Sequence, residues 1–104
     1  MIPLTSRLWI YTKGVVDHDK DQYGVYELLD SNDILYIGQG LVHSRLIAHF
    51  PDGSDPIVGA TQYRIEYTAS KKVAERREKE ELDKYYSQNR RYPKFNQRRD
   101  MIQQ

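Results

Sequence analysis

The amino-acid sequence predicts an α+β fold, because it contains the patterns of a β-hairpin, a further strand and a long helix. Residues 23–29 and 34–37 are rich in aromatic and branched side chains, and turn-forming residues separate them, which is a hairpin pattern. Residues 62–68 alternate between apolar and polar side chains, as a half-buried strand does. Residues 70–87 begin with Ser70, a good helix N-cap, and carry opposite charges four residues apart.

The hairpin holds two tyrosines in comparable positions. Gly24-Val25-Tyr26 lies in the first strand, and Tyr36-Ile37-Gly38 lies at the end of the second. Side chains alternate between the two faces of a strand, so we expect Tyr26 and Tyr36 to share one face of the paired strands. Both phenols would then reach a single site.

Length and composition indicate one soluble domain that spans residues 1–104. A chain of 104 residues has room for one modest core. It contains no cysteine, which excludes disulfides, thiolate metal sites and thiol nucleophiles. The sequence shows no long apolar run and no secretory h-region near its start, so we expect a cytoplasmic protein without a membrane partner.

The net charge of +1 hides an uneven distribution of charge along the chain. Between residues 14 and 44 a single base, Lys20, is outnumbered by six acids: Asp17, Asp19, Asp21, Glu27, Asp30 and Asp33. Between residues 84 and 99 there is no acid, but there are six bases: Lys84, Arg90, Arg91, Lys94, Arg98 and Arg99. A local basic field attracts polyanions, although a solvated tail explains the charge alone equally well.

The first 22 residues are expected to form a covering segment, a strand or a short arm, with Trp9 packed on the core. The alternating acids of residues 17–21 are superficially like the start of a calcium loop. However, Gln22 stands where such a loop needs glycine, and Leu28 stands where it needs a bidentate glutamate. We therefore interpret residues 17–21 as a solvated acidic loop.

Residues 41–50 predict a short helix, which Pro51 ends. On this helix Arg45 and His49 are four residues apart and therefore share a face. Such a pair on a surface helix is most often simply solvated, so it indicates a site only together with other motifs.

The long helix has an apolar side, marked by Ala74, Leu82 and Tyr85. Positions 78 and 81 complete this stripe at 3.6 residues per turn. Glu78 lies midway between two of the apolar residues, and a carboxylate on a buried stripe is costly unless it pairs or binds a cation. Glu78 is therefore a candidate metal ligand. The alternative is a purely structural role, in which Glu78 pairs with Arg45 or reaches solvent at the edge of the stripe.

The C-terminal stretch, residues 89–99, interleaves bases, aromatic residues and amides. This mixture suits binding to a nucleic-acid backbone, because Arg and Lys side chains bind phosphates and amide side chains hydrogen-bond sugar or phosphate oxygens. We expect the five basic side chains of this stretch to contact nucleic acid: Arg90, Arg91, Lys94, Arg98 and Arg99.

Taken in order, these motifs resemble the GIY-YIG nuclease domain over about residues 23–97. Gly24-Val25-Tyr26 is similar to the first family motif, with Val in place of Ile, and Tyr36-Ile37-Gly38 is identical to the second. Arg45 and His49 resemble the catalytic arginine and the histidine one turn later. Glu78 is similar to the metal-binding glutamate, and Asn96 of Pro93-Lys94-Phe95-Asn96 resembles the late asparagine.

The resemblance implies a small three-stranded antiparallel sheet flanked by helices, and hydrolysis of DNA phosphodiester bonds with Mg²⁺ (or Mn²⁺). In this comparison Arg45 would stabilise charge on the phosphoryl oxygens, and Glu78 would bind the metal. Tyr26 would help to deprotonate the attacking water, with His49 accepting the phenol's proton. The catalytic set is completed by a positioning role for Tyr36 and a structural role for Asn96.

Several alternatives remain open at this stage. The interval from Glu78 to Asn96 is longer than expected for compact members of the family, and Glu81 is an alternative metal ligand. We expect no DNA-reading module after the nuclease domain, so a homodimer partner or a separate DNA-recognition protein would supply sequence specificity. The competing functions are a non-catalytic nucleic-acid-binding or interaction module with the same fold, and an RNA-cleaving enzyme.

Overall fold

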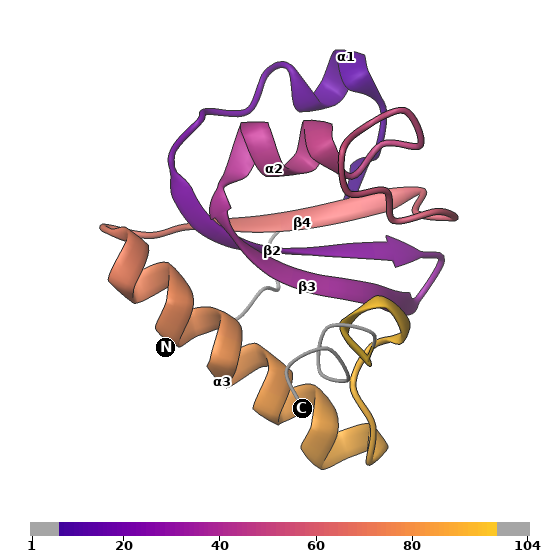
Figure 1. The fold of residues 1–104 in the computed structure, drawn as a ribbon, viewed down its shortest axis with the longest axis vertical. Helices are drawn as coiled ribbons and strands as arrows, with labels where there is room; N and C mark the ends of the chain where they lie inside the picture. Colours follow the sequence, from indigo (N-terminus) through magenta and orange to yellow (C-terminus); the bar gives the residue numbers. More distant parts are fainter. Residues whose placement is uncertain (1–6, 98–104) are drawn as a thin grey trace.

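The computed structural model describes residues 7–97, which form a four-stranded antiparallel sheet with helices on both faces (Figure 1). The sheet has the strand order β1-β4-β2-β3, where the strands are β1 (Trp9–Ile10), β2 (Tyr23–Asp30), β3 (Asp33–Leu41) and β4 (Gln62–Tyr67). The helices are α1 (Lys13–Val16), α2 (Val42–Ala48) and α3 (Lys71–Asn89). Within residues 7–97, no helix combines the length and the apolar character that crossing a membrane requires.

The α+β class is confirmed, but the expected count of three strands is wrong. The additional strand is β1, which pairs with β4 at the edge of the sheet through Trp9 and Tyr63. Only two residues of β1 pair, and such a short run gives little alternation to read in the sequence. Trp9 is half-buried and packs against the core, as expected, while residues 2–4 of the predicted covering segment lie outside the described residues.

The hairpin of β2 and β3 forms as predicted, and it occupies the β3 edge of the sheet. Ser31 in its turn has a φ of 57°, in the left-handed region that tight turns use. β3 continues to Leu41, four residues beyond the predicted end, and it leads directly into α2. The second tyrosine motif therefore lies in the middle of an edge strand.

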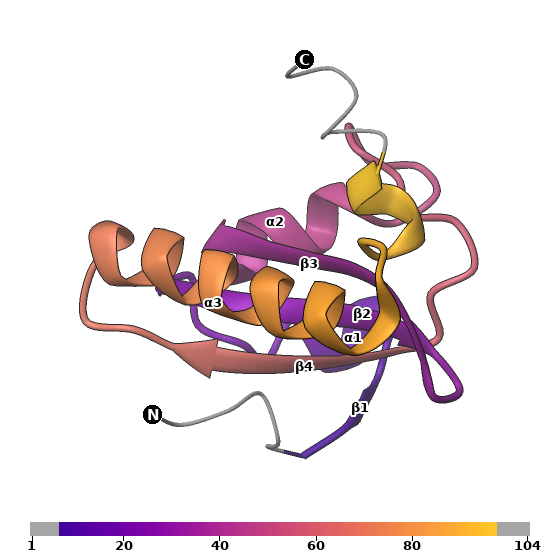
Figure 2. The ribbon, with the colours of Figure 1, turned by 90° about the horizontal axis from the view of Figure 1, so that it is seen from below.

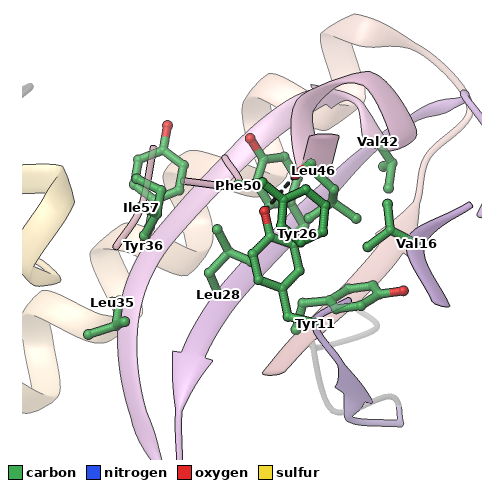
Figure 3. Close-up of a cluster of buried hydrophobic side chains, with 11 residues drawn as sticks. Tyr11, Val16, Tyr26, Leu28, Leu35, Tyr36, Val42, Leu46, Phe50 and Ile57 are labelled. Carbon is green, nitrogen blue, oxygen red and sulfur yellow. Dashed lines mark hydrogen bonds between the residues drawn. The ribbon is translucent and has the colours of Figure 1, made fainter. Parts of the chain in front are cut away.

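The sheet separates two cores (Figures 1 and 2). On one face, α1 and α2 pack against aromatic and aliphatic residues of the strands, whereas α3 runs across β2 and β3 on the other face. Figure 3 shows Tyr26 and Leu28 of β2 with Val42 and Leu46 of α2 in the first core. Val25 belongs to the second core, because adjacent side chains of a strand point to opposite faces.

The acidic segment of residues 17–21 is not merely solvated, which corrects the prediction. Asp21 accepts hydrogen bonds from the backbone nitrogen (2.9 Å) and the hydroxyl (2.8 Å) of Ser44, in the first turn of α2. Leu41, the N-cap residue of α2, has no side chain that could accept such a bond. Asp21 therefore caps the helix from a distant segment, while Asp19 accepts a hydrogen bond from the Tyr63 hydroxyl.

The charged helix α3 begins as predicted, because the Ser70 hydroxyl accepts a hydrogen bond from the nitrogen of Val73. Its buried face contains Ala74, Glu81 and Tyr85 of the predicted stripe and, in addition, Arg77, whereas Glu78 and Leu82 are half-buried. Arg77 binds both carboxylate oxygens of Glu66 on β4, at 3.0 and 2.9 Å, and one oxygen of Glu81 at 2.9 Å. Arg77 and Glu81, which carry opposite charges four residues apart, thus form a buried ion pair, and the bond of Arg77 to Glu66 fastens α3 to the sheet.

Candidate active site

The two motif tyrosines lie on the same face of the hairpin, as predicted. Tyr36 is paired with Leu28 and Tyr26 with Gly38, and the two phenol rings have their centres 6.3 Å apart. Tyr26 is completely buried and Tyr36 is 2% exposed. Both phenols are therefore part of the first core as well as candidates for chemistry.

Gly38 provides the space in which the two phenols meet. A Cβ atom at this position would lie 2.6 Å from the hydroxyl oxygen of Tyr26 and 2.6 Å from a ring carbon of Tyr36. Both distances are shorter than any packed side chain tolerates. The glycine of the second motif is thus required by the close approach of the two aromatic side chains.

His49 follows the last residue of α2 and is fully buried between the phenols and the next loop. Its Nε2 atom lies 2.8 Å from the Tyr26 hydroxyl, and its Nδ1 atom lies 2.7 Å from the backbone oxygen of Asp55. The ring also contacts Tyr36 edge to face, with centroids 5.1 Å apart. The predicted proximity of His49 to the Tyr26 phenol is present.

Arg45 lies one turn before His49 and is the partly exposed member of this group, with 33% of its side chain accessible. Its guanidinium forms an ion pair with the Asp55 carboxylate at 3.0 Å and a hydrogen bond with the Tyr26 side chain. Burial acts to lower the pKa of Arg45, but the interactions with the phenols and the carboxylate outweigh it and raise the pKa. The guanidinium therefore stays positively charged beside the Tyr26 oxygen.

Tyr26, Tyr36, Arg45 and His49 together are called the phenol cluster below. Gly40, in β3, lets Arg45 approach the strand, since a Cβ there would lie 3.0 Å from the Arg45 Cγ and its φ of 141° disfavours a side chain. The cluster offers a phenol linked to a base, with a fixed cation beside its oxygen. Such an arrangement can transfer a proton and bind an anion.

Glu78 is half-buried on α3, which covers the opposite face of the sheet. Leu82, one turn later on the same side of the helix, packs against the buried cluster that contains Ile37 of β3, whereas Arg77 on the other side reaches Glu66 of β4. The Glu78 side of α3 is therefore turned toward the β3 edge. Glu81 lies in the buried face and is bound by Arg77.

Asn96 is buried against the exposed edge of β3. Its Oδ1 atom accepts a hydrogen bond from the nitrogen of Ile37, and its Nδ2 atom donates one to the Ile37 oxygen, both at 2.9 Å. The amide thereby bonds the backbone of the second tyrosine motif. Figure 2 shows the short C-terminal turn that carries Asn96 beside β3.

The basic C-terminal residues are described only in part. Arg90, Arg91 and Lys94 are exposed, and Arg90 ends α3 in the left-handed conformation with a φ of 59°. Arg98 and Arg99 lie outside the described residues. Asn96 fastens this stretch to β3, so Lys94 lies two residues from a direct contact with the second motif.

A metal site would depend on few protein ligands. Among residues 7–97 there is no group of three or more His, Cys, Asp or Glu side chains that could hold an ion together. Mg²⁺ keeps several waters and commonly takes only one or two carboxylates together with substrate phosphates. The single carboxylate of Glu78 fits such an ion.

Sequence reasoning did not identify Asp55, which contacts two members of the phenol cluster. It stands in a loop of turn-forming residues, Pro51-Asp52-Gly53-Ser54-Asp55-Pro56, where an aspartate has an ordinary local role. Asp52 in the same loop pairs with the exposed Lys13 instead. No local signal separates the two aspartates, because the side chains of both pair with residues of other elements, Arg45 of α2 and Lys13 of α1.

The fold and these contacts define a small α+β domain with a polar cluster beneath an edge strand of its sheet. A family model described as a domain of unknown function (DUF7508) matches residues 2–84, and the chain belongs to this family. The matched range contains the whole phenol cluster and Glu78 and ends before Asn96. No curated protein and no solved structure matches the chain.

Proposed function

We propose that this protein is a GIY-YIG-type endonuclease that hydrolyses DNA phosphodiester bonds with Mg²⁺ (or Mn²⁺). The observation that carries the proposal is the contact of the Tyr26 hydroxyl with both His49 and Arg45. A free phenol with a pKa of about 10 is a poor base at neutral pH. Such a base requires an adjacent imidazole that takes the phenol's proton and a cation that stabilises the phenolate.

In the proposed reaction, the proton of Tyr26 passes to Nε2 of His49, and the phenolate takes a proton from the attacking water. The water oxygen bonds to phosphorus as the P–O bond to the leaving nucleotide breaks, and solvent protonates the leaving oxygen. Arg45 stabilises the charge on the phosphoryl oxygens, and Tyr36 orients the water or the phosphate. Because Tyr26 is fully buried, water and phosphate have to enter at the exposed side of Arg45.

The location of the carboxylates favours Glu78 over Glu81 as the metal ligand. Glu81 is bound by the buried Arg77, whereas the Glu78 side of α3 faces the β3 edge. A bound Mg²⁺ supplies positive charge to the phosphate oxygens. Arg90, Arg91 and Lys94 would attract the DNA backbone toward the same edge of the sheet.

The proposal is tested with supercoiled plasmid and Mg²⁺, by comparing the wild-type protein with Tyr26→Phe and Tyr67→Phe. Each variant removes one hydroxyl from the same sheet face, but the Tyr67 hydroxyl only accepts a hydrogen bond from the nitrogen of Lys20. We expect Tyr26→Phe to lower the nicking rate by about 100-fold or more, and Tyr67→Phe to nick normally. Equal nicking by both variants would contradict the role of Tyr26.

The same assay separates the nuclease from the competing functions. Salt-dependent DNA binding without cleavage by the wild-type protein in either Mg²⁺ or Mn²⁺ would favour a binding module instead. Faster cleavage of a matched RNA than of DNA would reassign the substrate. A double-strand break requires two protomers or two successive nicks, because one domain carries one phenol cluster.

A further inference from the structure

We propose that Asp55 is a positioning residue of the phenol cluster: its backbone oxygen selects the tautomer of His49, and its carboxylate fixes the guanidinium of Arg45. Both contacts are made by one residue, and both of its partners touch the Tyr26 hydroxyl. The consequence for turnover rests on the proposed nuclease function, whereas the two contacts do not.

The first contact determines where the hydrogen of a neutral His49 lies. The Asp55 backbone oxygen can only accept a hydrogen bond, and it lies 2.7 Å from Nδ1 of His49. Nδ1 therefore carries the hydrogen, which leaves Nε2 as the acceptor facing the Tyr26 hydroxyl at 2.8 Å. With the opposite tautomer, Nε2 would already hold a hydrogen and could not take the proton of Tyr26.

The second contact sets the direction of the guanidinium of Arg45. One Nη atom of Arg45 lies 3.0 Å from Oδ2 of Asp55, and the side chain also hydrogen-bonds Tyr26. Arginine has five N–H donors in a rigid planar fork, so two fixed contacts orient the others. Since the Arg45 side chain is one-third exposed, its remaining donors are available to an incoming phosphate.

The loop that carries Asp55 is itself fastened to the end of α2. The nitrogen of Asp55 donates to the oxygen of Ala48 at 2.9 Å, and the nitrogen of Ile57 donates to the oxygen of His49 at 3.0 Å. A Cβ at Gly53 would collide with the oxygen of Ala48, so the loop approaches the helix more closely than a larger residue permits. The backbone oxygen of Asp55 is therefore held in a defined place.

The experiment compares the full chain with Asp55→Ala, Asp55→Asn and the matched control Asp52→Asn, whose side chain pairs with Lys13 in the same loop. Long-range ¹H–¹⁵N spectra of the wild-type protein report the His49 tautomer, and the guanidinium resonances of Arg45 report how firmly it is held. We expect hydrogen on Nδ1, and Arg45 resonances that broaden or average in both Asp55 variants but not in the control. Asp55→Asn keeps the shape of the side chain and serves where Asp55→Ala fails to fold.

In the plasmid assay, we expect both Asp55 variants to lower kcat by about 10- to 100-fold with little change in KM, and Asp52→Asn to behave as wild type. A neutral His49 with hydrogen on Nε2, unchanged Arg45 resonances, or kcat at or above the wild-type value would each overturn the proposal. If the wild-type protein cuts no nucleic acid, the nuclease function fails, while the two spectroscopic readouts still decide the role of Asp55.

Discussion

The side-chain amide of Asn96 bonds both backbone hydrogen-bonding groups of Ile37, with two distances of 2.9 Å. In the part of the chain that the structure describes, β3 is an edge strand, so no other strand there lies beside the outward backbone groups of Ile37. The Asn96 amide makes the two hydrogen bonds that a neighbouring strand would otherwise make, and the short C-terminal turn holds Asn96 in place. Because Ile37 lies between Tyr36 and Gly38, this contact supports the phenol cluster from outside the sheet.

Asn96→Ala is predicted to lower the free energy of unfolding by about 1–3 kcal/mol, because it leaves buried backbone groups of Ile37 unsatisfied. The control is Gln97→Ala, since the neighbouring Gln97 is exposed and its side chain donates to the backbone oxygen of Tyr92. Urea unfolding of both variants measures the difference. Equal stabilities would show that the contact with Ile37 is not needed.

Gly38→Ala is predicted to disrupt the phenol cluster, because the new Cβ would overlap the Tyr26 hydroxyl and the Tyr36 ring. We expect a loss of stability of about 1–3 kcal/mol, together with altered tyrosine and His49 resonances. Gly14→Ala in α1 is the control, since a Cβ there has no atom within 4 Å, and a change of less than about 1 kcal/mol follows. Unchanged stability and unchanged resonances in Gly38→Ala would mean that the rings of Tyr26 and Tyr36 can separate without loss of folding free energy.

Asp21 is predicted to make the stability of the domain sensitive to acid. Its backbone and side-chain hydrogen bonds with Ser44 lower the pKa of the carboxyl below its usual value. The stabilisation from the ionised Asp21 carboxylate is therefore fully present above the ordinary pKa of aspartate, near 4. It is lost as the pH falls through the lowered pKa that Asp21 has in the folded state. Asp21→Asn keeps an acceptor for the helix end but cannot titrate.

Urea unfolding at pH values from 2 to 7 measures this effect. We expect the wild-type protein to lose more stability than Asp21→Asn as the pH falls, and Asp21→Ala to be less stable than wild type at neutral pH by about 0.5–2 kcal/mol. Parallel pH profiles of the wild type and Asp21→Asn would refute the capping role.

Arg77→Ala is predicted to destabilise the packing of α3 on the sheet by about 3–5 kcal/mol, because it leaves the buried Glu81 and the half-buried Glu66 without this cation. The neighbouring Arg76 is exposed on the same helix, so Arg76→Ala should change the stability by less than about 0.5 kcal/mol. Thermal unfolding compares the two variants. Similar melting temperatures would place Arg77 among the solvated charges of α3.

The elements of the fold follow from local sequence patterns, but the pairing of charges does not. The hairpin, β4 and the Ser70 start of α3 are confirmed because alternation, turn residues and capping act between near neighbours. Strand β1 was expected only as a strand or a short arm and was not counted in the three-stranded sheet, since two paired residues contain almost no pattern. The inward face of α3 was predicted from its apolar residues. Arg77 also lies on that face, because it forms an ion pair with Glu66 of β4, which is distant in the sequence from the helix pattern.

In the candidate site, too, local sequence patterns predict some of the positions but not the contacts between elements. The positions of Tyr26 and Tyr36 on one face follow from strand alternation, and the shared side of Arg45 and His49 follows from helix periodicity. Asp55 and Asp21 could not be recognised, because each acts on a partner in another element and otherwise is an ordinary loop aspartate. The roles in catalysis assigned to the six motif residues remain predictions.

The most direct measurement is a plasmid nicking assay in Mg²⁺ with the wild-type protein, Glu78→Ala and Glu75→Ala. Glu75 is exposed on α3, so its variant removes a carboxylate from the same helix as a matched control. With all three proteins shown to be folded, wild type and Glu75→Ala should nick the plasmid and Glu78→Ala should not. Nicking by Glu78→Ala at the wild-type rate would contradict the proposed metal-dependent mechanism.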